Sequence, residues 1–331
     1  MRIGSAIGIT DTGRRRLRNE DAFICEPPLF AVADGMGGAR AGEIAAGLAA
    51  AALEEADAQT RGAEGVVALI AEANRRIWER SLNDPETAGM GTTVTAALVD
   101  IASATVAIGH VGDSRAYRLR DGAIEQLTVD HSLVAELVQS GILTPEEAER
   151  HPQRSAITRA LGTEPTVEVD AFTVEASPGD VFLICSDGLS VMLGDDDLAQ
   201  VVSSADGDVT RAAEDLVRAA NARGGEDNIT VVLFELVAGA SDVAGGIEAA
   251  VEPEAEVAPP AAEDGAFAAE TLAPASPSSD AVVDDEQPRA DASDPSLRRH
   301  GAGPGGRAAA LLLIASVLAV AALVVLWSVS R

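Results

Sequence analysis

The sequence predicts an α+β fold in which helices cover antiparallel sheets. Short apolar runs bounded by glycine, proline and aspartate recur along the first 238 residues, and such runs are typical of buried strands. Pairs of helical stretches lie between groups of these strands. This grouping, in place of strict strand–helix alternation, favours sheets that are layered against helices.

In the first half of this region, apolar runs and glycine-rich turns define the strands. A run of apolar residues from Leu29 to Ala33 ends at Asp34, and three glycines follow within four residues. Glycine permits tight turns and a close approach of the backbone to a ligand. The expected elements are strands at 3–10, 22–25 and 29–33 and helices at 40–58 and 62–82.

The second half contains most of the predicted strands. Asp121-Gly122 is a hairpin turn signal, and Thr144-Pro145 is a helix start with threonine as the N-cap and proline at the first position. The expected strands are 92–99, 104–110, 116–120, 167–174, 181–185 and 231–237. The expected helices are 132–140, one that begins at 145, 195–203 and 208–222.

The composition excludes several classes of protein. The 331 residues carry a formal net charge of −29 and include no lysine, so a nucleic-acid partner is not expected. The two cysteines, Cys25 and Cys185, stand far apart and form neither a disulfide framework nor a zinc pattern. A reducing compartment is the simple interpretation. The first residues lack the basic and apolar regions of a signal peptide.

Aspartates stand where the predicted strands begin or end. Five such carboxylates without a cluster of His or Cys favour a hard cation such as Mg²⁺ or Mn²⁺ over zinc. A bound cation would also relieve their mutual repulsion. For any single motif, an ordinary aspartate in a turn remains the alternative. The five residues are Asp21, Asp34, Asp113, Asp187 and Asp227.

Three further features have both a functional and a plain structural interpretation. Four arginines within five residues, at positions 14–18, form either a solvated loop or an oxyanion site, because guanidinium binds two phosphate oxygens at once. His110, at a strand end, is either a ligand or proton donor or, more commonly, a structural histidine. The polar segment 151–162 is either a flap beside a cleft or a surface loop.

Taken together, six motifs resemble the metal-dependent protein phosphatases, the PPM or type 2C serine/threonine family in its bacterial form. The resemblance covers nearly all of residues 1–238, and the motifs stand in the family's order. The resemblance implies a central antiparallel β-sandwich flanked by helices, with the metals at one end. The motifs are Arg16 to Asp21, Ala33 to Gly38, Gly91-Thr92-Thr93, His110 to Arg115, Cys185 to Leu189 and Asp227 to Thr230.

The resemblance implies a role for each metal-site residue. Asp34 bridges two Mn²⁺ or Mg²⁺ ions, and Gly35 gives one of them its backbone carbonyl. Asp187 and Asp227 bind the companion ion. Asp21 acts near the pair of ions, partly through water.

Outside the dimetal pair, the resemblance implies a third, weaker metal site at Asp113 and a phosphate-binding role for Arg16. Water activated by the two ions attacks phosphorus, with Arg16, Asp21 and Asp34 as catalytic residues. The substrates implied are phosphoserine and phosphothreonine in proteins. Some eukaryotic members place a histidine, the proposed general acid, where this chain has Met36. The donor of the last proton is therefore left open.

The remainder of the chain has a different character. Residues 239–307 are rich in alanine, proline and acids, which predicts a disordered linker. Residues 308–327 carry no charge and are long enough to cross a bilayer core. Arginines precede this span, so we expect a single-pass anchor in the cell membrane with 1–238 in the cytoplasm and 328–331 beyond.

The expected function is hydrolysis of phosphoproteins in the cytoplasm, opposing a Ser/Thr protein kinase that is also in the membrane. Two alternatives stay open from the sequence. One is a phosphatase of a small phosphometabolite, because a metal site recognises the phosphoryl group and not its carrier. The other is a membrane-tethered binding module with little catalysis, which the complete set of acids argues against.

Overall fold

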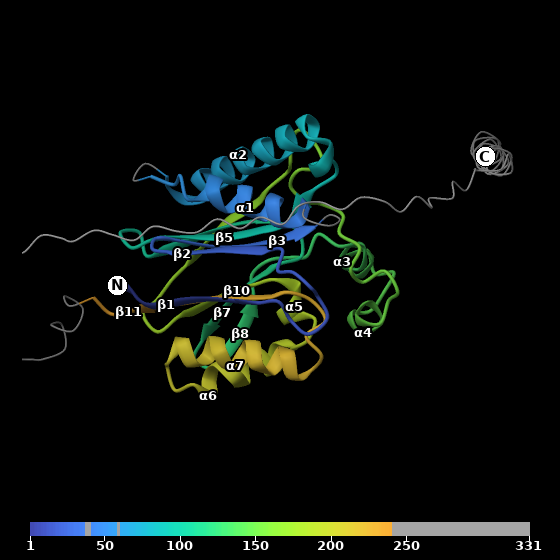
Figure 1. Ribbon diagram of the computed structural model, residues 1–331. Coiled ribbons are helices and arrows are strands. Elements are labelled where there is room, and N and C mark those ends of the chain that lie inside the picture. Colours follow the sequence, from blue (N-terminus) through green and yellow to red (C-terminus); the bar gives the residue numbers. More distant parts are fainter. Residues whose placement is uncertain (37–40, 58–59, 240–331) are drawn as a thin grey trace, which may run out of the picture. The chain divides into compact units, whose positions relative to one another are not determined.

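The computed structural model describes residues 1–36, 41–57 and 60–239 (Figure 1). All of them belong to the first of the two units into which the chain divides, Met1–Pro253. None of the helices in these ranges is long and apolar enough to cross a membrane. The predicted linker 239–307, apart from its first residue, and the predicted membrane span 308–327 lie outside the described residues.

Two antiparallel sheets form the centre of the described region. One has the order β1-β11-β10-β7-β8, and the other has the order β2-β3-β5-β6-β9 with β4 paired to β3. The strands are β1 Arg2–Asp11, β2 Asp21–Glu26, β3 Leu29–Met36, β4 Gly91–Thr92, β5 Val94–Asp100, β6 Thr105–Val111, β7 Arg115–Arg120, β8 Ala123–Gln126, β9 Asp170–Glu175, β10 Val181–Cys185 and β11 Ile229–Val237.

Helices cover the outer face of each sheet (Figure 1). Helices α1 and α2 pack on the sheet that contains β3, and α6 and α7 pack on the sheet that contains β11. The helices are α1 Ala41–Leu53, α2 Gly62–Asn83, α3 Leu133–Gln139, α4 Pro145–Glu149, α5 Asp187–Ser190, α6 Asp195–Ser204 and α7 Val209–Ala222, and a 3₁₀ turn spans Pro85–Thr87. The predicted β-sandwich flanked by helices is confirmed for the described part of the chain.

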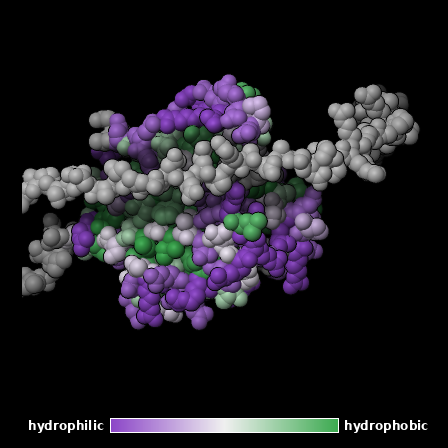
Figure 2. All heavy atoms as spheres, viewed as in Figure 1, coloured by the Kyte–Doolittle hydropathy of each residue, from purple (hydrophilic) through white to green (hydrophobic). Residues whose placement is uncertain are grey.

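Stacked aromatic rings join the two sheets in the middle layer. Phe234 of β11 stacks on Phe30 of β3 with ring centroids 4.0 Å apart, and Phe182 of β10 lies 5.1 Å from Phe234. All three side chains are almost fully buried. Hydrophilic residues dominate the outer helices, and apolar residues show in the band between the two helical layers (Figure 2). Burial of this middle layer stabilises the sandwich and fixes the ends of the strands relative to one another.

The predicted elements differ from the structure mainly in length and in the shortest pieces. The strand expected at 167–174 begins only at Asp170, and the helix expected at 40–58 ends at Leu53. Strand β8 and the four-residue helix α5 were not predicted. The predicted Thr144 cap is present as a capping box, in which Thr144 and Glu147 each accept a hydrogen bond from the other's backbone N–H.

Candidate metal centre

Five strand ends meet at one end of the sandwich, and each carries one of the predicted aspartates. Asp21 begins β2 and lies directly opposite Asp34 of β3 in the antiparallel pair. Asp113 follows β6, Asp187 follows β10, and Asp227 precedes β11. Antiparallel pairing sets β7, β10 and β11 in register within one sheet, and it joins β2 to β3 and β5 to β6 in the other, so residues far apart in the sequence become neighbours.

Three carboxylate oxygens in this group are buried without a hydrogen-bond partner. They are the Oδ1 atoms of Asp21, Asp113 and Asp187. A buried carboxylate oxygen without a partner is costly, and native structures keep such atoms mainly where an ion or water binds. The three oxygens are therefore suited to a cation.

The pKa values of the acids show that the group cannot carry all its negative charges unaided. Burial, with the charges of its neighbours, raises the pKa of Asp34 well above its usual value. Burial is also the main cause that raises the pKa of Asp21 and of Asp187 to about 6 and that of Asp113 to about 8. A divalent cation would favour the charged forms.

Hydroxyl groups around the acids hold them in place. The backbone of Asp34 donates to Thr93 Oγ1 (3.1 Å), and its carbonyl accepts from Thr92 Oγ1 (2.8 Å). The Thr230 hydroxyl donates to Asp21 Oδ2 at 2.5 Å. The Gly91-Thr92-Thr93 motif thus fixes the backbone of the central aspartate.

Gly35, which was predicted to present its carbonyl to a metal, lies where no side chain fits. A Cβ atom at this position would come within 2.3 Å of the Gly42 carbonyl oxygen and 2.5 Å of the Glu20 carbonyl oxygen. Its N–H donates to Glu20 O at 3.2 Å. The glycine lets the end of β3 pack directly against the backbone of α1 and of the arginine-rich loop.

Arg16 reaches the same group of acids from the loop between β1 and β2. Its guanidinium donates to Asp227 Oδ2 at 2.5 Å, and this contact is half-exposed. The hydrogen bond to Asp227 is the main cause that raises the pKa of Arg16, and the charge of Asp34 contributes. Arg16 therefore belongs to the site, and it contacts a carboxylate that was itself predicted to bind metal.

Asn228 holds this loop, a role that the sequence did not reveal. Its Oδ1 accepts from the Glu20 backbone N–H (2.8 Å), and its Nδ2 donates to the carbonyls of Thr12 (3.0 Å) and Arg18 (2.8 Å). Asn228 is buried. The only signal in the sequence was its place after Asp227 in one of the six motifs.

His110 is a structural residue. Its Nδ1 lies 2.9 Å from Thr95 Oγ1 and its Nε2 lies 3.1 Å from the Val129 carbonyl, so both ring nitrogens have partners. Burial lowers its pKa to about 4, which keeps the ring neutral. The structural alternative for this histidine is therefore the one that the geometry supports.

A second histidine ties the segment 151–162 to the Asp113 turn. His131 Nδ1 accepts from the Gly112 backbone N–H at 2.9 Å, and its Nε2 lies 3.2 Å from Asp170 Oδ2. Arg159 donates to the other oxygen of Asp170 at 2.6 Å. These contacts attach the segment to the Asp113 turn.

The donor set fits a hard cation that keeps part of its water shell. Across the described ranges, no three His, Cys, Asp or Glu side chains are arranged to hold an ion. Mg²⁺ usually binds through one or two carboxylates and retains several waters, so a closed cage is not required. Each unpaired oxygen of Asp21, Asp113 and Asp187 is suited to serve as one of the few protein ligands of such a hydrated ion, whereas a soft metal would lack its preferred ligands.

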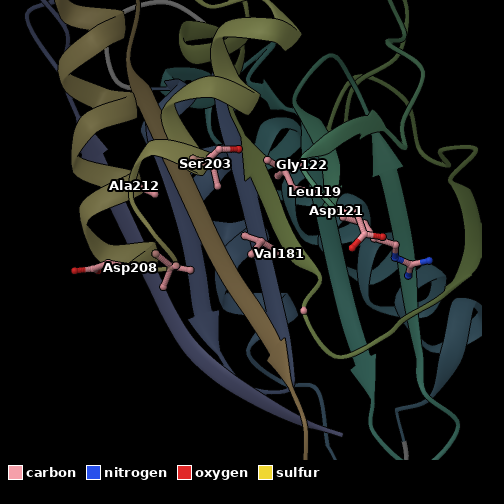
Figure 3. A pocket seen from close by; sticks show the side chains of 12 residues that line it. Leu119, Asp121, Gly122, Val181, Ser203, Asp208 and Ala212 are labelled. Atoms are coloured by element: carbon pink, nitrogen blue, oxygen red, sulfur yellow. The ribbon is translucent and has the colours of Figure 1, made fainter.

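A separate cavity lies away from the acids. It has a volume of about 180 Å³ and is formed by the β7–β8 turn, the start of β10 and the α6–α7 connection (Figure 3). Its labelled residues include Leu119, Asp121, Val181, Ser203 and Asp208. None of the five clustered aspartates lines it.

Comparison with known proteins identifies the family. Residues 13–233 match the profile of the family described as Protein phosphatase 2C. The chain belongs to this family. It is 41% identical over 238 residues to serine/threonine phosphatase stp of Listeria monocytogenes, a match that covers 68% of this chain and 93% of the relative.

Solved structures agree with this assignment to the protein phosphatase 2C family. The Mycobacterium tuberculosis serine/threonine phosphatase PstP/Ppp superposes with a TM-score of 0.68 at 39% identity, covering 71% of this chain and 100% of the other. The catalytic domain of PstP in complex with two manganese ions superposes with a TM-score of 0.66 at 37% identity, covering 71% and 99%. The prediction of a metal-dependent serine/threonine protein phosphatase is confirmed.

Proposed function

We propose that this chain hydrolyses phosphoserine and phosphothreonine in proteins with two Mn²⁺ or Mg²⁺ ions as cofactors. The observation that supports this most strongly is the convergence of five aspartates, three of them with a buried unpaired oxygen, in a protein phosphatase 2C chain. A related catalytic domain has been solved with two manganese ions. The same ions in this chain would favour the charged forms of the acids, whose pKa values are raised by burial and then by the charges of neighbouring aspartates.

Among the acids, we assign Asp34 the bridging position between the two ions. The charges of the other four aspartates all contribute to its raised pKa, as expected of the residue at the centre of the group. Gly35 follows directly and gives its carbonyl to one ion. Asp187 and Asp227 bind the companion ion, and Asp21 acts near the two ions, partly through water. The tight packing at Gly35 supports its assignment, because a side chain there would push the carbonyl away.

Two further assignments concern Asp113 and Arg16. Asp113, with its unpaired Oδ1, holds a third and weaker ion. Arg16 binds the substrate phosphate, for which it exchanges its contact with Asp227. A guanidinium is suited to this exchange because it donates to a carboxylate and to a phosphoryl group in the same geometry.

The chemistry needs no covalent intermediate on the protein. Divalent ions at such a site supply Lewis acidity and lower the pKa of water. Arg16 neutralises charge on the phosphoryl oxygens as the transition state forms. Cys185 is an unsuitable nucleophile because it is fully buried and burial raises its pKa to about 12. Met36 has no proton to give, so the leaving alkoxide takes its proton from another group.

For the whole chain, we propose a phosphatase domain at 1–238, an acidic linker at 239–307 and a membrane anchor at 308–327. The support is the charge-free span of 20 residues with arginines before it. The domain then acts on cytoplasmic proteins and opposes a Ser/Thr kinase in the same membrane. Protease treatment of intact and of lysed spheroplasts tests this topology, because the domain should be cut only after lysis.

Release of phosphate from a phosphothreonine peptide tests the activity. We expect Mn²⁺-dependent release that a chelator abolishes and that Asp34→Asn reduces at least about a thousandfold. Asp121→Asn is the matched control, because Asp121 is exposed in the hairpin turn, away from the acids. Full release in the presence of the chelator would refute the proposal.

A further inference from the structure

Two arginines and one glutamate from three separate loops meet beside the metal centre. Glu226 Oε1 lies 3.3 Å from an Arg15 guanidinium nitrogen, and its Oε2 lies 4.0 Å from a nitrogen of Arg154. Arg15 belongs to the β1–β2 loop, Arg154 to the segment after α4, and Glu226 to the loop before β11. We call Arg15 and Arg154 the arginine rim.

Backbone contacts fix two of these loops against each other. The Arg14 N–H donates to the Gly225 carbonyl at 2.7 Å. Asn228 holds the same arginine loop from its other side. Because the two backbones are fixed, the next residues of the two loops pair in the same order: Arg15 pairs with Glu226, and Arg16 pairs with Asp227.

The rim is accessible, and its charge is unlike that of the rest of the chain. The side chains of Arg15 and Arg154 are 68% and 45% exposed, and that of Glu226 is 41% exposed. The whole chain has 53 acidic residues against 24 basic ones. A cationic rim on so acidic a protein attracts anionic segments locally, whereas the remaining surface repels them.

We propose that the arginine rim binds an acidic side chain of the substrate close to its phosphorylated residue, and that Glu226 occupies this position until the substrate displaces it. This inference rests on the proposed function and narrows it to a substrate class, phosphopeptides with aspartate or glutamate beside the phosphoresidue. The neighbouring pair of Arg16 and Asp227 supports this inference by analogy. In the proposed function, the substrate phosphate replaces Asp227 on Arg16, and in the same way a substrate carboxylate replaces Glu226 on the rim.

The spacing sets how far the acidic residue stands from the phosphoresidue. Arg15 and Arg16 are consecutive, and so are the carboxylates that they bind. Consecutive Cα atoms are about 3.8 Å apart, so the acidic residue falls within about three positions of the phosphoresidue. The exchange replaces one exposed ion pair by another, so the preference is modest, about three- to tenfold in kcat/KM.

Two phosphothreonine peptides test the proposal with the full chain and Mn²⁺. One carries Asp or Glu at the three positions on either side, and the other carries Asn or Gln there. We expect the acidic peptide to have the higher kcat/KM, mainly through a lower KM, and the advantage to shrink as salt screens the charges. The double variant Arg15→Gln with Arg154→Gln should lose the advantage while hydrolysis of para-nitrophenyl phosphate stays unchanged.

Two further variants make the test specific. Glu226→Gln removes the internal carboxylate, so we expect it to lower the KM of the acidic peptide. Arg218→Gln is the matched control, because Arg218 is an exposed arginine of α7 that pairs with Asp215 on the same helix. It should change neither peptide's kinetics.

Equal kcat/KM for the two peptides, or an advantage that survives the double variant, would overturn the proposal. A third result would also overturn it: an unphosphorylated peptide of residues 248–256 inhibits hydrolysis, while the two substrates have the same kcat/KM. In that case the chain's own acidic segment, and not a substrate side chain, would be the occupant of the rim. Failure of the proposed function looks different: the wild-type protein would release phosphate from neither peptide nor from para-nitrophenyl phosphate.

Discussion

Replacing Asn228 with alanine tests whether this side chain holds the loop that carries Arg16. The amide makes three hydrogen bonds to that loop, with Glu20, Thr12 and Arg18. Each contributes about 1 kcal/mol net, and the site is too buried for water to replace them well. We therefore expect a loss of about 3 kcal/mol, which lowers the Tm of a domain of this size by about 6–12 °C.

The assay combines thermal unfolding with peptide kinetics. A loosened loop leaves Arg16 less well placed, so the KM of a phosphothreonine peptide should also rise. Asn83→Ala is the control, because the Asn83 amide makes one exposed hydrogen bond, to Glu79 O within the same helix. If the Asn228 variant has the Tm of the wild type and an unchanged KM for the peptide, the Asn228 amide does not hold the loop.

Two further predictions follow from the pKa shifts. Burial lowers the pKa of His110 to about 4, whereas the unfolded chain takes up the proton near 6.5, so stability should fall by about 2 kcal/mol between about pH 6.5 and 5. His110→Gln should flatten this dependence in denaturant titrations, and an unchanged slope would contradict it. Burial raises the pKa of Asp113 to about 8, whereas the unfolded chain loses this proton near 3.9, so the stability falls as the pH rises from about 4 to 8. Asp113→Asn should therefore stabilise chelator-treated protein by about 4 kcal/mol more at about pH 8 than near pH 5, whereas an equal effect at both would argue against an unfavourable charge.

The sequence predicted the strand ends and their acids because both are local features. An apolar run that stops at an aspartate, as at Asp34 and Asp187, needs no knowledge of the fold to be recognised. These strand ends converge because of the antiparallel register of the sheets. The order of the motifs and the family resemblance allowed that convergence to be predicted. The helix α5 escaped prediction because four residues cannot show a helical period.

The contacts between distant residues were not predictable from pattern alone. The pair of Arg16 and Asp227 joins positions 211 residues apart, and the hydrogen bonds of Asn228 span similar distances. Which arginine of the loop reaches which acid depends on the turn geometry and on side-chain rotamers. These are fixed only when the loop packs against the start of β11, so no local signal encodes them.

The position of manganese in a crystal of this protein, located by anomalous scattering, is the most direct test of the proposed metal centre. We expect two peaks about 3.5–4 Å apart, with Asp34 between them and Asp187 and Asp227 on one of them. Peaks elsewhere on the acidic surface, or none within reach of Asp34, would contradict the claim that these aspartates share a pair of ions.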